Sequence, residues 1–434
     1  MFIDQNSNGI YDSGTDATIT TTAGSGGTWS ATINASGVSG GTYNVYAVTT
    51  SAAGSLTSSV SSGLSLTIDR TLPGAPSTTI DLATASDSGS SSTDNITNVT
   101  APTFRVSLAG TSAVAGDVLE LHVTTRLVHS YGLGQLAGRR DGAGIIERGM
   151  DLLWRKHRDA RHGGFVWALR DGAVAEGTKL AYGHVFVLLA ASTAKLAGHP
   201  DADRLLADAA QVLEDRFWDR QAGLFRDEFT RDWQVFSTYR GMNANMHGVE
   251  ALLAAHEATG EGEYLRRAGG ILDFFIAGQA AANGWRIPEH YDDRWRPDPG
   301  YEGNPMFRPA GTTPGHSFEM ARLLLQYWDL AGRPDNAAPV QARLLVETAL
   351  RDAWLERGGL VYTLDADGRV ARADRYWWPV TEAIGALAAL IKLDPQPQDE
   401  EWYRRLWRFA DAQLIDHHRG GWFPEPGGPT CGQF

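Results

Sequence analysis

A turn that begins with glycine and continues with aromatic or aliphatic residues returns five times along the chain, and it constrains the fold more than any other feature. Its copies lie about 60 to 75 residues apart and begin at Gly163, Gly223, Gly284, Gly358 and Gly420. Two stretches with helical spacing of apolar residues lie between successive copies. A helical hairpin that repeats in this way cannot bury its apolar face alone, so the sequence predicts a solenoid or a closed toroid.

The apolar periodicity predicts ten helices. Their expected bounds are 124–137, 144–157, 180–196, 201–217, 245–258, 263–279, 316–331, 338–355, 379–392 and 399–416. Most odd-numbered helices are apolar almost all round and the even-numbered ones carry more charge, so we expect inner helices wrapped by outer ones. An (α/α)6 toroid needs twelve helices. We therefore expect an all-α toroid of this type over residues 121–434, and we expect it to be incomplete.

Residues 1–120 belong to a different class of domain. They hold two of the 38 Lys and Arg residues and one of the 14 Trp residues, and small and hydroxylated residues dominate them. Short alternating runs at 29–33, 43–48, 64–68 and 103–106 are separated by Gly- and Ser-rich turns, which is typical of antiparallel strands. The pattern predicts an all-β immunoglobulin-like sandwich with a linker. The segment 68–104 resembles the linkers between tandem immunoglobulin-like repeats of bacterial surface adhesins.

The charge of the chain excludes some partners. The net charge of −13 divides into −7 for residues 1–120, with 2 basic and 9 acidic residues, and −6 for the remainder, with 36 and 42. Neither half is basic, so nothing in the composition attracts nucleic acid. No apolar run is long enough to span a membrane. The single Cys431 cannot form an internal disulfide.

A loop near the start of the chain has the spacing of a calcium site. Oxygen-bearing side chains alternate in it at Asp4, Asn6, Asn8 and Asp12. Asp16 is available to close the loop, but the bidentate Glu that usually does so is absent. The pattern predicts a structural Ca²⁺ site, and the alternative is an Asx-rich turn.

The most informative short segment is 314–319. Its Pro-Gly pair ends the preceding structure and places His316 in the first turn of a helix. Glu319, three residues on, leaves from the same face. A helix N-terminus favours a neutral imidazole, which can accept a proton, so the pair suits proton transfer near neutral pH. The alternative is a histidine that only caps its helix.

Polar and aromatic residues also cluster where the other inner helices are expected to begin. They are Arg126 and His129, Tyr182 and His184, Asn243, Asn245, Met246 and His247, and Trp377, Trp378 and Glu382. In a toroid these helix starts converge on one central cavity. Aromatic walls with Arg, Asn, His and Glu suit a sugar, because its faces are apolar and its edges need hydrogen bonds.

Five ordered segments carry a family resemblance that covers residues 121 to about 425. They are 126–131, 182–187, 243–247, 314–319 and 377–382, and each resembles a motif of the N-acylglucosamine 2-epimerase family at the corresponding place. The Arg-x-x-His and Tyr-Gly-His-x-Phe details resemble the mannose and sulfoquinovose isomerase branch most. This resemblance implies a sugar isomerase or epimerase that interconverts an aldose with its ketose, of the mannose–fructose type, and that acts on a monosaccharide without a cofactor.

The resemblance also implies roles for individual residues. His316 would be the catalytic acid or base, with Glu319 supporting it and His247 as the further catalytic residue. Arg126 would bind substrate hydroxyls near the reacting carbons. The remaining substrate-binding residues would be Tyr182, Asn243, Met246, Trp378 and Glu382. An aldose would lose its C2 proton to a neutral His, and return of the proton to C1 or to the opposite face of C2 would give the ketose or the epimer.

The chain departs from the family at both ends of the toroid. Family members have another helix before the Arg motif and a last helix that carries a second catalytic His. Neither is evident here, and we do not transfer that role to His417 or His418. We therefore expect impaired activity and self-association through the exposed ends of the toroid. The enzyme part suggests a cytoplasmic location and residues 1–120 a cell-surface one, so location stays open.

Three other functions remain compatible with the sequence. The first is an N-acylglucosamine 2-epimerase, which differs from a mannose–fructose isomerase in its sugar and product. The second is a glycoside hydrolase that uses paired carboxylates such as Glu289 and Glu319. The third is a surface carbohydrate-binding module, which the composition of residues 1–120 favours.

Overall fold

The computed structural model of the 434-residue chain describes residues 1–21, 33, 35, 37–50, 57–68, 81–82, 104–105, 118–139, 141–301, 303, 308–418 and 421–426. The chain divides into two compact units. One comprises Met1–Val114 with Gly432–Phe434, and the other comprises Ala115–Cys431.

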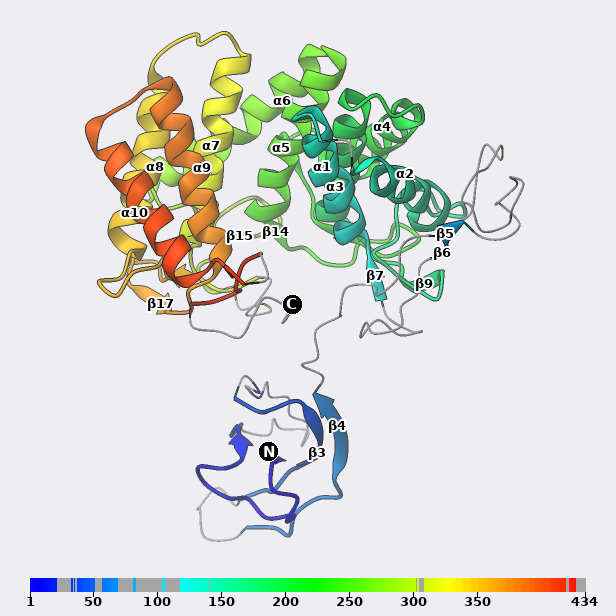
Figure 1. Ribbon diagram of the computed structural model, residues 1–434, viewed down its shortest axis with the longest axis vertical. Helices are drawn as coiled ribbons and strands as arrows, with labels where there is room; N and C mark the ends of the chain where they lie inside the picture. Colours follow the sequence, from blue (N-terminus) through cyan, green and yellow to red (C-terminus); the bar gives the residue numbers. More distant parts are fainter. Residues whose placement is uncertain are drawn as a thin grey trace. The chain divides into compact units, whose positions relative to one another are not determined.

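The N-terminal unit contains one four-stranded antiparallel sheet in the order β2-β1-β3-β4. Its strands are β1 (Phe2–Asp4), β2 (Ala17–Thr18), β3 (Gly41–Tyr46) and β4 (Leu64–Ile68), and a separate pair joins β5 (Asp81–Leu82) to β6 (Phe104–Arg105). Figure 1 shows β3 and β4 side by side. Phe2 and Ile3 are buried, and the Phe2 ring packs against Tyr11 and Tyr46.

Two of the predicted strands, 43–48 and 64–68, correspond closely to β3 and β4, and the short β6 lies in the predicted run 103–106. The predicted strand at 29–33 falls almost entirely outside the described residues. Because the described part of this unit holds one small sheet and one strand pair, the immunoglobulin-like sandwich stays a prediction.

The boundary between the units lies earlier than the sequence indicated. We predicted it after residue 120, and the units divide after Val114. The reason is a strand pairing. The strand β7 (Val118–Glu120) pairs antiparallel with β8 (Ala168–Arg170), which pairs in turn with β9 (Ala173–Glu176), so residues 118–120 belong with the helices.

In its described residues, the second unit contains the ten helices that the periodicity predicts. They are α1 (Leu121–Leu136), α2 (Ala143–Leu152), α3 (Ala181–Leu196), α4 (Ala202–Val212), α5 (Met242–Thr259), α6 (Gly262–Leu272), α7 (Pro314–Leu330), α8 (Ala337–Ala353), α9 (Trp377–Leu393) and α10 (Pro397–Gln413). Three of the outer helices continue into π-helical turns, η1 (Leu153–His157), η2 (Leu213–Phe217) and η3 (Asp273–Ala280).

The turns between the helices carry short strands. These are β10 (Lys179–Leu180), β11 (Trp218–Asp219), β12 (Leu224–Phe225), β13 (Glu228–Phe229), β14 (Arg240–Gly241), β15 (His290–Tyr291), β16 (Thr363–Leu364) and β17 (Val370–Arg372). Each copy of the repeated turn places a glycine at positive φ, as at Gly163, Gly223 and Gly284. A side chain is disfavoured at that φ, which explains why glycine opens the repeat.

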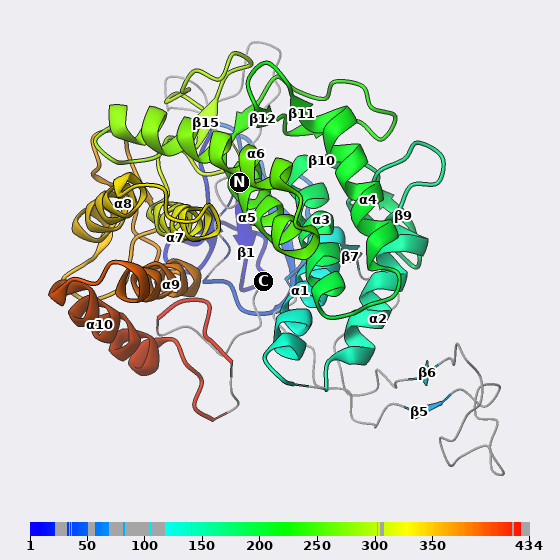
Figure 2. The same ribbon diagram turned by 90° about the horizontal axis from the view of Figure 1, so that it is seen from above.

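Inner and outer helices form two layers, as the alternation of charge predicts. The helices α1, α3, α5, α7 and α9 pack in that order along an arc, and each even-numbered helix packs outside the odd-numbered helix before it. Figure 2 shows this arc with α2, α4, α6, α8 and α10 on its outside. The arrangement is the (α/α)6 type of toroid, with ten helices in the part of the chain that the structure describes.

Helix α1 exposes an apolar face. Its exposed apolar residues are Val123, Leu127, Tyr131, Leu133 and Leu136. At the other end of the arc, Trp407 of α10 is exposed, whereas its neighbour Leu406 is fully buried. The helix turns Leu406 inward, where α10 packs against α9. Within the described residues, no helix is long and apolar enough to cross a membrane.

A recurring hydrogen bond joins each repeat to the next. The N–H at or just before the start of an inner helix donates to a carbonyl in the loop that follows the hairpin which that helix begins. These bonds are Leu121 to Trp167, Ala181 to Asp227, Met242 to Glu289, Thr312 to Leu364 and Trp377 to Pro424, at 2.8 to 3.0 Å. We call this set the seam. It brings loop residues against the inner helix starts, where the predicted site residues lie.

Candidate active site

The inner helix starts bring together side chains from several repeats. Arg126 of α1 donates from Nη2 to the Tyr182 hydroxyl of α3 at 3.2 Å, and its guanidinium lies 4.5 Å from the centre of the Phe186 ring. The Tyr182 and Phe186 rings lie 5.3 and 4.7 Å from the His247 ring of α5, measured between ring centres. Helices α1, α3 and α5 therefore build one wall of a shared site.

His247 has two carboxylates near one of its ring nitrogens. Its Nδ1 is 3.1 Å from Oε2 of Glu250 and 3.5 Å from Oε1 of Glu319 on α7. Burial lowers the pKa of His247, and the charge of Arg126 acts in the same direction, although Glu250 opposes them. A neutral imidazole that donates from Nδ1 leaves Nε2 as its free acceptor.

Arg322 of α7 is shared by three carboxylates. Its guanidinium lies 3.9 Å from Glu250, 4.0 Å from Glu319 and 3.6 Å from Glu382 of α9. Burial raises the pKa of Glu319 well above its usual value, and the charges of Glu382 and Glu250 add to the effect. Burial also raises the pKa of Glu382. The cluster therefore holds more carboxylates than it can keep ionised.

His316 has a carboxylate partner that the sequence did not indicate. Its Nδ1 lies 2.9 and 3.0 Å from the two oxygens of Glu289, and its ring packs 5.3 Å from the Trp378 ring. It is close enough to His247 and Glu382 for their charges to interact. Two histidines, each with a carboxylate at Nδ1, thus meet in one region.

The expectation that Glu319 supports His316 is wrong. Glu319 lies beside the imidazole of His247, and the carboxylate beside His316 is that of Glu289. Helical side chains point back toward the helix N-terminus. His316 lies in the first turn of α7, so it reaches back to the loop that contains Glu289. Glu319 lies one turn further on and reaches α5 instead.

The other predicted substrate-binding residues differ in their surroundings. Tyr182, Trp378 and Glu382 are half-buried beside the histidines. Asn243 lies one turn before His247, and its buried Oδ1 has no hydrogen-bond partner among the described residues. Met246 is fully buried in the apolar core, because it is about 100° around the helix from His247. It cannot contact a substrate in this structure.

Several polar residues at the helix starts have structural roles. Asn245 bonds the backbone of Phe225, and His184 accepts from the Phe165 N–H at 2.9 Å. His129 contacts the Thr193 hydroxyl at 2.7 Å. Sequence reasoning missed Glu250, Arg322 and Phe186. The signal was there, because Glu250 and Arg322 each follow a predicted residue by three positions and so share its helix face.

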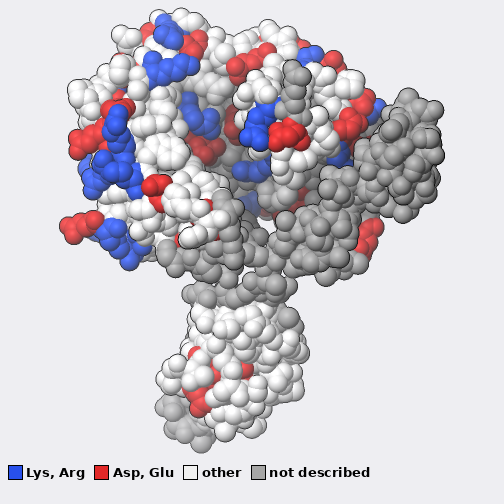
Figure 3. All heavy atoms as spheres, viewed as in Figure 1, with Lys and Arg blue, Asp and Glu red and all other residues white. Residues whose placement is uncertain are grey.

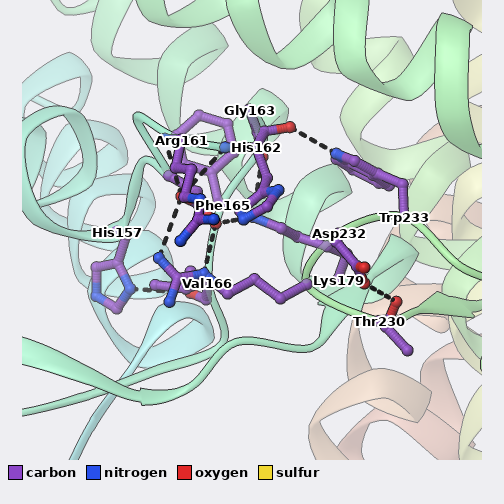
Figure 4. Close-up of polar contacts among 12 residues, drawn as sticks. His157, Arg161, His162, Gly163, Phe165, Val166, Lys179, Thr230, Asp232 and Trp233 are labelled. Atoms are coloured by element: carbon purple, nitrogen blue, oxygen red, sulfur yellow. Dashed lines mark hydrogen bonds and ion pairs between the residues drawn. The ribbon is translucent and has the colours of Figure 1, made fainter.

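A second polar cluster fixes the first loop of the toroid. The fully buried Lys179 donates to Asp159 at 3.2 Å and to the Gly163 carbonyl at 2.9 Å, and Asp159 also accepts from Arg231. The indole of Trp233 donates to the His162 carbonyl at 2.7 Å, as Figure 4 shows. All these groups have partners, so the cluster is a structural connection between the loops.

Both units contain side chains of the kinds that bind metal ions. Ligand atoms of His247, Glu250 and Glu319 lie within 4.8 Å of one another, a grouping that the sequence did not reveal, but Arg322 already supplies positive charge there. In the N-terminal loop, Asp4 accepts from the N–H groups of Asn8 and Gly9.

The other two aspartates of the N-terminal loop are also bonded within it. Asp12 accepts from the amides of Asn6 and Asn8, and Asp16 accepts from the Gln5 and Asp12 N–H groups. These are the bonds of an Asx-rich loop, and calcium binding stays a prediction.

Figure 3 shows basic and acidic side chains side by side over the helical unit, including in the hollow at the centre of the face in view. The fold and the site define a helical-toroid enzyme equipped for proton transfer. The family model described as N-acylglucosamine 2-epimerase (GlcNAc 2-epimerase) matches residues 106–426, and the chain belongs to this family.

Several proteins of known name resemble the chain. It is 40% identical over 309 residues to a D-mannose isomerase of Pseudomonas cannabina pv. alisalensis, covering 69% of this chain and 74% of the relative. It is 37% identical over 325 residues to a D-mannose isomerase of Thermobifida fusca, covering 72% and 80%. A D-mannose isomerase crystal structure superposes with a TM-score of 0.67 at 33% identity, covering 71% of this chain and 80% of the other.

A cellobiose 2-epimerase from Spirochaeta thermophila DSM 6192 shares the fold, with a TM-score of 0.65 at 23% identity and coverage of 74% and 82%. The family resemblance that the five motifs predict is therefore confirmed. The chain is a sugar isomerase or epimerase.

Proposed function

We propose that this protein interconverts D-mannose and D-fructose by proton transfer between C2 and C1 of the open-chain sugar. The observation that carries the proposal is the pair of histidines, His247 and His316, each with a carboxylate at Nδ1. The identity to two D-mannose isomerases supports the choice of sugar.

The proposed chemistry uses the free Nε2 of each ring. His316 takes the C2 proton of the aldose, a cis-enediol forms, and the same nitrogen returns the proton to C1. The O2 hydroxyl proton moves to O1. In this proposal, His247 and Arg126 lie beside these two oxygens. The net change is one proton from C2 to C1 and one from O2 to O1, and no cofactor is needed.

The charge of the site supports a neutral sugar. Three carboxylates, Glu250, Glu319 and Glu382, face Arg322. Burial raises the pKa of Glu319, and the negative charges of Glu382 and Glu250 raise it further. A phosphate or sulfonate group would add negative charge where there is already a surplus. We therefore place unsubstituted mannose ahead of phosphorylated sugars and sulfoquinovose.

The test is product analysis by NMR after incubation of the whole chain with D-mannose in D₂O, with EDTA present. Fructose supports the proposal, and the share of it that carries deuterium at C1 measures how often the proton on His316 exchanges with the solvent before it returns. Glucose would indicate C2 epimerisation, and conversion of N-acetylglucosamine but not mannose would point to the alternative epimerase. His316→Gln should lose about 10²-fold or more in rate. His256→Gln is the matched control, because His256 is on α5 and bonds only the Glu261 carbonyl. Equal rates in the two variants would contradict the role of His316.

A further inference from the structure

Two loop carboxylates occupy equivalent places in successive repeats. The Asp227 carbonyl accepts from the first N–H of α3, and its carboxylate accepts from the Gly241 N–H, just before α5, at 2.8 Å. The Glu289 carbonyl accepts from the first N–H of α5, and its carboxylate accepts from the Thr313 N–H, just before α7, at 3.1 Å. Each residue therefore connects two successive inner helices.

Glu289 has one partner that its counterpart lacks. Both of its oxygens lie within 3.0 Å of Nδ1 of His316, which is three residues after Thr313. The equivalent position in α5, three residues after Gly241, is Ala244, which has no polar side chain. The shared bond is structural, and the bond to His316 is an addition that Asp227 does not make, in the repeat that carries the proposed base.

We infer that Glu289 is a positioning residue for the proposed reaction, one that holds His316 as the Nδ1–H tautomer with Nε2 directed to the substrate. The inference rests on the proposed function. A carboxylate at Nδ1 fixes the ring orientation and the tautomer, and it stabilises the imidazolium that forms when Nε2 takes the C2 proton. The proton then leaves Nε2 for C1, and Nδ1 keeps its own proton throughout.

The surroundings of Glu289 suit this role. Its side chain is 5% exposed, so water competes little for its oxygens. It lies at the N-terminus of α7, where the helix dipole stabilises negative charge. Its backbone is held on both sides, by the bond to Met242 and by the pairing of His290 with Gly241 in β14 and β15. The carboxylate is therefore placed before substrate binds.

The experiment compares Glu289→Gln with Asp227→Asn in the whole chain. The two changes replace equivalent carboxyl groups by amides, but only Glu289 faces a histidine. The ¹⁵N chemical shifts of His316 in histidine-labelled protein report its tautomer, and kcat and KM for mannose report catalysis. In Glu289→Gln we expect loss of the Nδ1–H tautomer and a fall in kcat of about 10²-fold, with KM changed less than about threefold. Asp227→Asn should leave both the tautomer and kcat near wild type.

The two readouts separate the possible failures. An unchanged tautomer in Glu289→Gln overturns the inference, whatever the activity. Equal falls in kcat in both variants, with the tautomer of His316 retained, would show that Glu289 acts only through its bond to the Thr313 N–H. If the wild-type chain converts no sugar, the proposed function fails, but the chemical shifts still decide whether Glu289 sets the tautomer.

Discussion

Gly315 offers a sharp test of how the start of α7 is built. A Cβ added at this position would lie 2.3 Å from Cζ3 and 2.4 Å from Cη2 of Trp378. Carbon atoms in ordinary contact are about 3.5 to 4.0 Å apart, so Gly315→Ala requires a relative movement of more than about 1 Å. Trp378 packs on the ring of His316, the residue that follows Gly315. The movement must therefore displace Trp378, His316 or both.

Opposing effects on stability make activity the better measure. Overpacking costs about 1 to 3 kcal/mol, whereas replacing Gly by Ala inside a helix gains about 1 kcal/mol. The net loss in unfolding free energy is therefore about 0 to 2 kcal/mol. A misplacement of about 1 Å in a reacting group costs about 10²-fold in rate, so kcat should fall by that factor.

The assay is mannose-to-fructose conversion together with urea unfolding of the same preparations. Gly270→Ala in α6 is the matched control, because a Cβ there would meet no atom within 4 Å. It should gain up to about 1 kcal/mol and keep full activity. If Gly315→Ala has wild-type kcat and stability, then the close packing of α7 against Trp378 does not position His316, and the reasoning fails.

Three further outcomes are expected. Lys179→Met should lower the unfolding free energy by about 3 kcal/mol, measured in urea, because it leaves the buried Asp159 with less positive charge. Burial raises the pKa of Asp227 to about 7, so the proton that it holds stabilises the fold at low pH, and this contribution falls as pH rises from about 4 to 7. As pH rises across that range, the unfolding free energy of Asp227→Asn, relative to that of wild type, should therefore increase. The purified chain should self-associate, and Leu127→Glu with Leu133→Glu should lower its mass in light scattering, because these residues lie on the exposed face of α1.

The helices and the region of the site could be predicted because they depend on local patterns. Apolar periodicity placed the ten helices, and glycine at positive φ marked each turn. The repeat then indicated that His247 and His316 lie near each other. The partner of His316 could not be predicted in this way, because Glu289 is 27 residues earlier and reaches it only through the loop geometry of the seam.

For residues 1–120, the local sequence patterns predicted strands but not the fold that they form. Alternation predicted β3 and β4, but it specifies strands without specifying how many sheets pack together. Burial of Met246 was missed for a related reason. A motif names adjacent positions, whereas neighbouring positions on a helix point about 100° apart, so His247 and Met246 face different surroundings.

The seam has a consequence for how the toroid forms. Each of its bonds joins residues about fifty positions apart, so the bond at each inner helix start can form as soon as the hairpin which that helix begins, and the loop after it, have been synthesised. Contacts of such short range favour rapid folding compared with pairing between distant parts of a chain. The toroid can therefore grow from α1 towards α10 in chain order, and the surroundings of His316 are completed only when the hairpin that supplies Trp378 arrives.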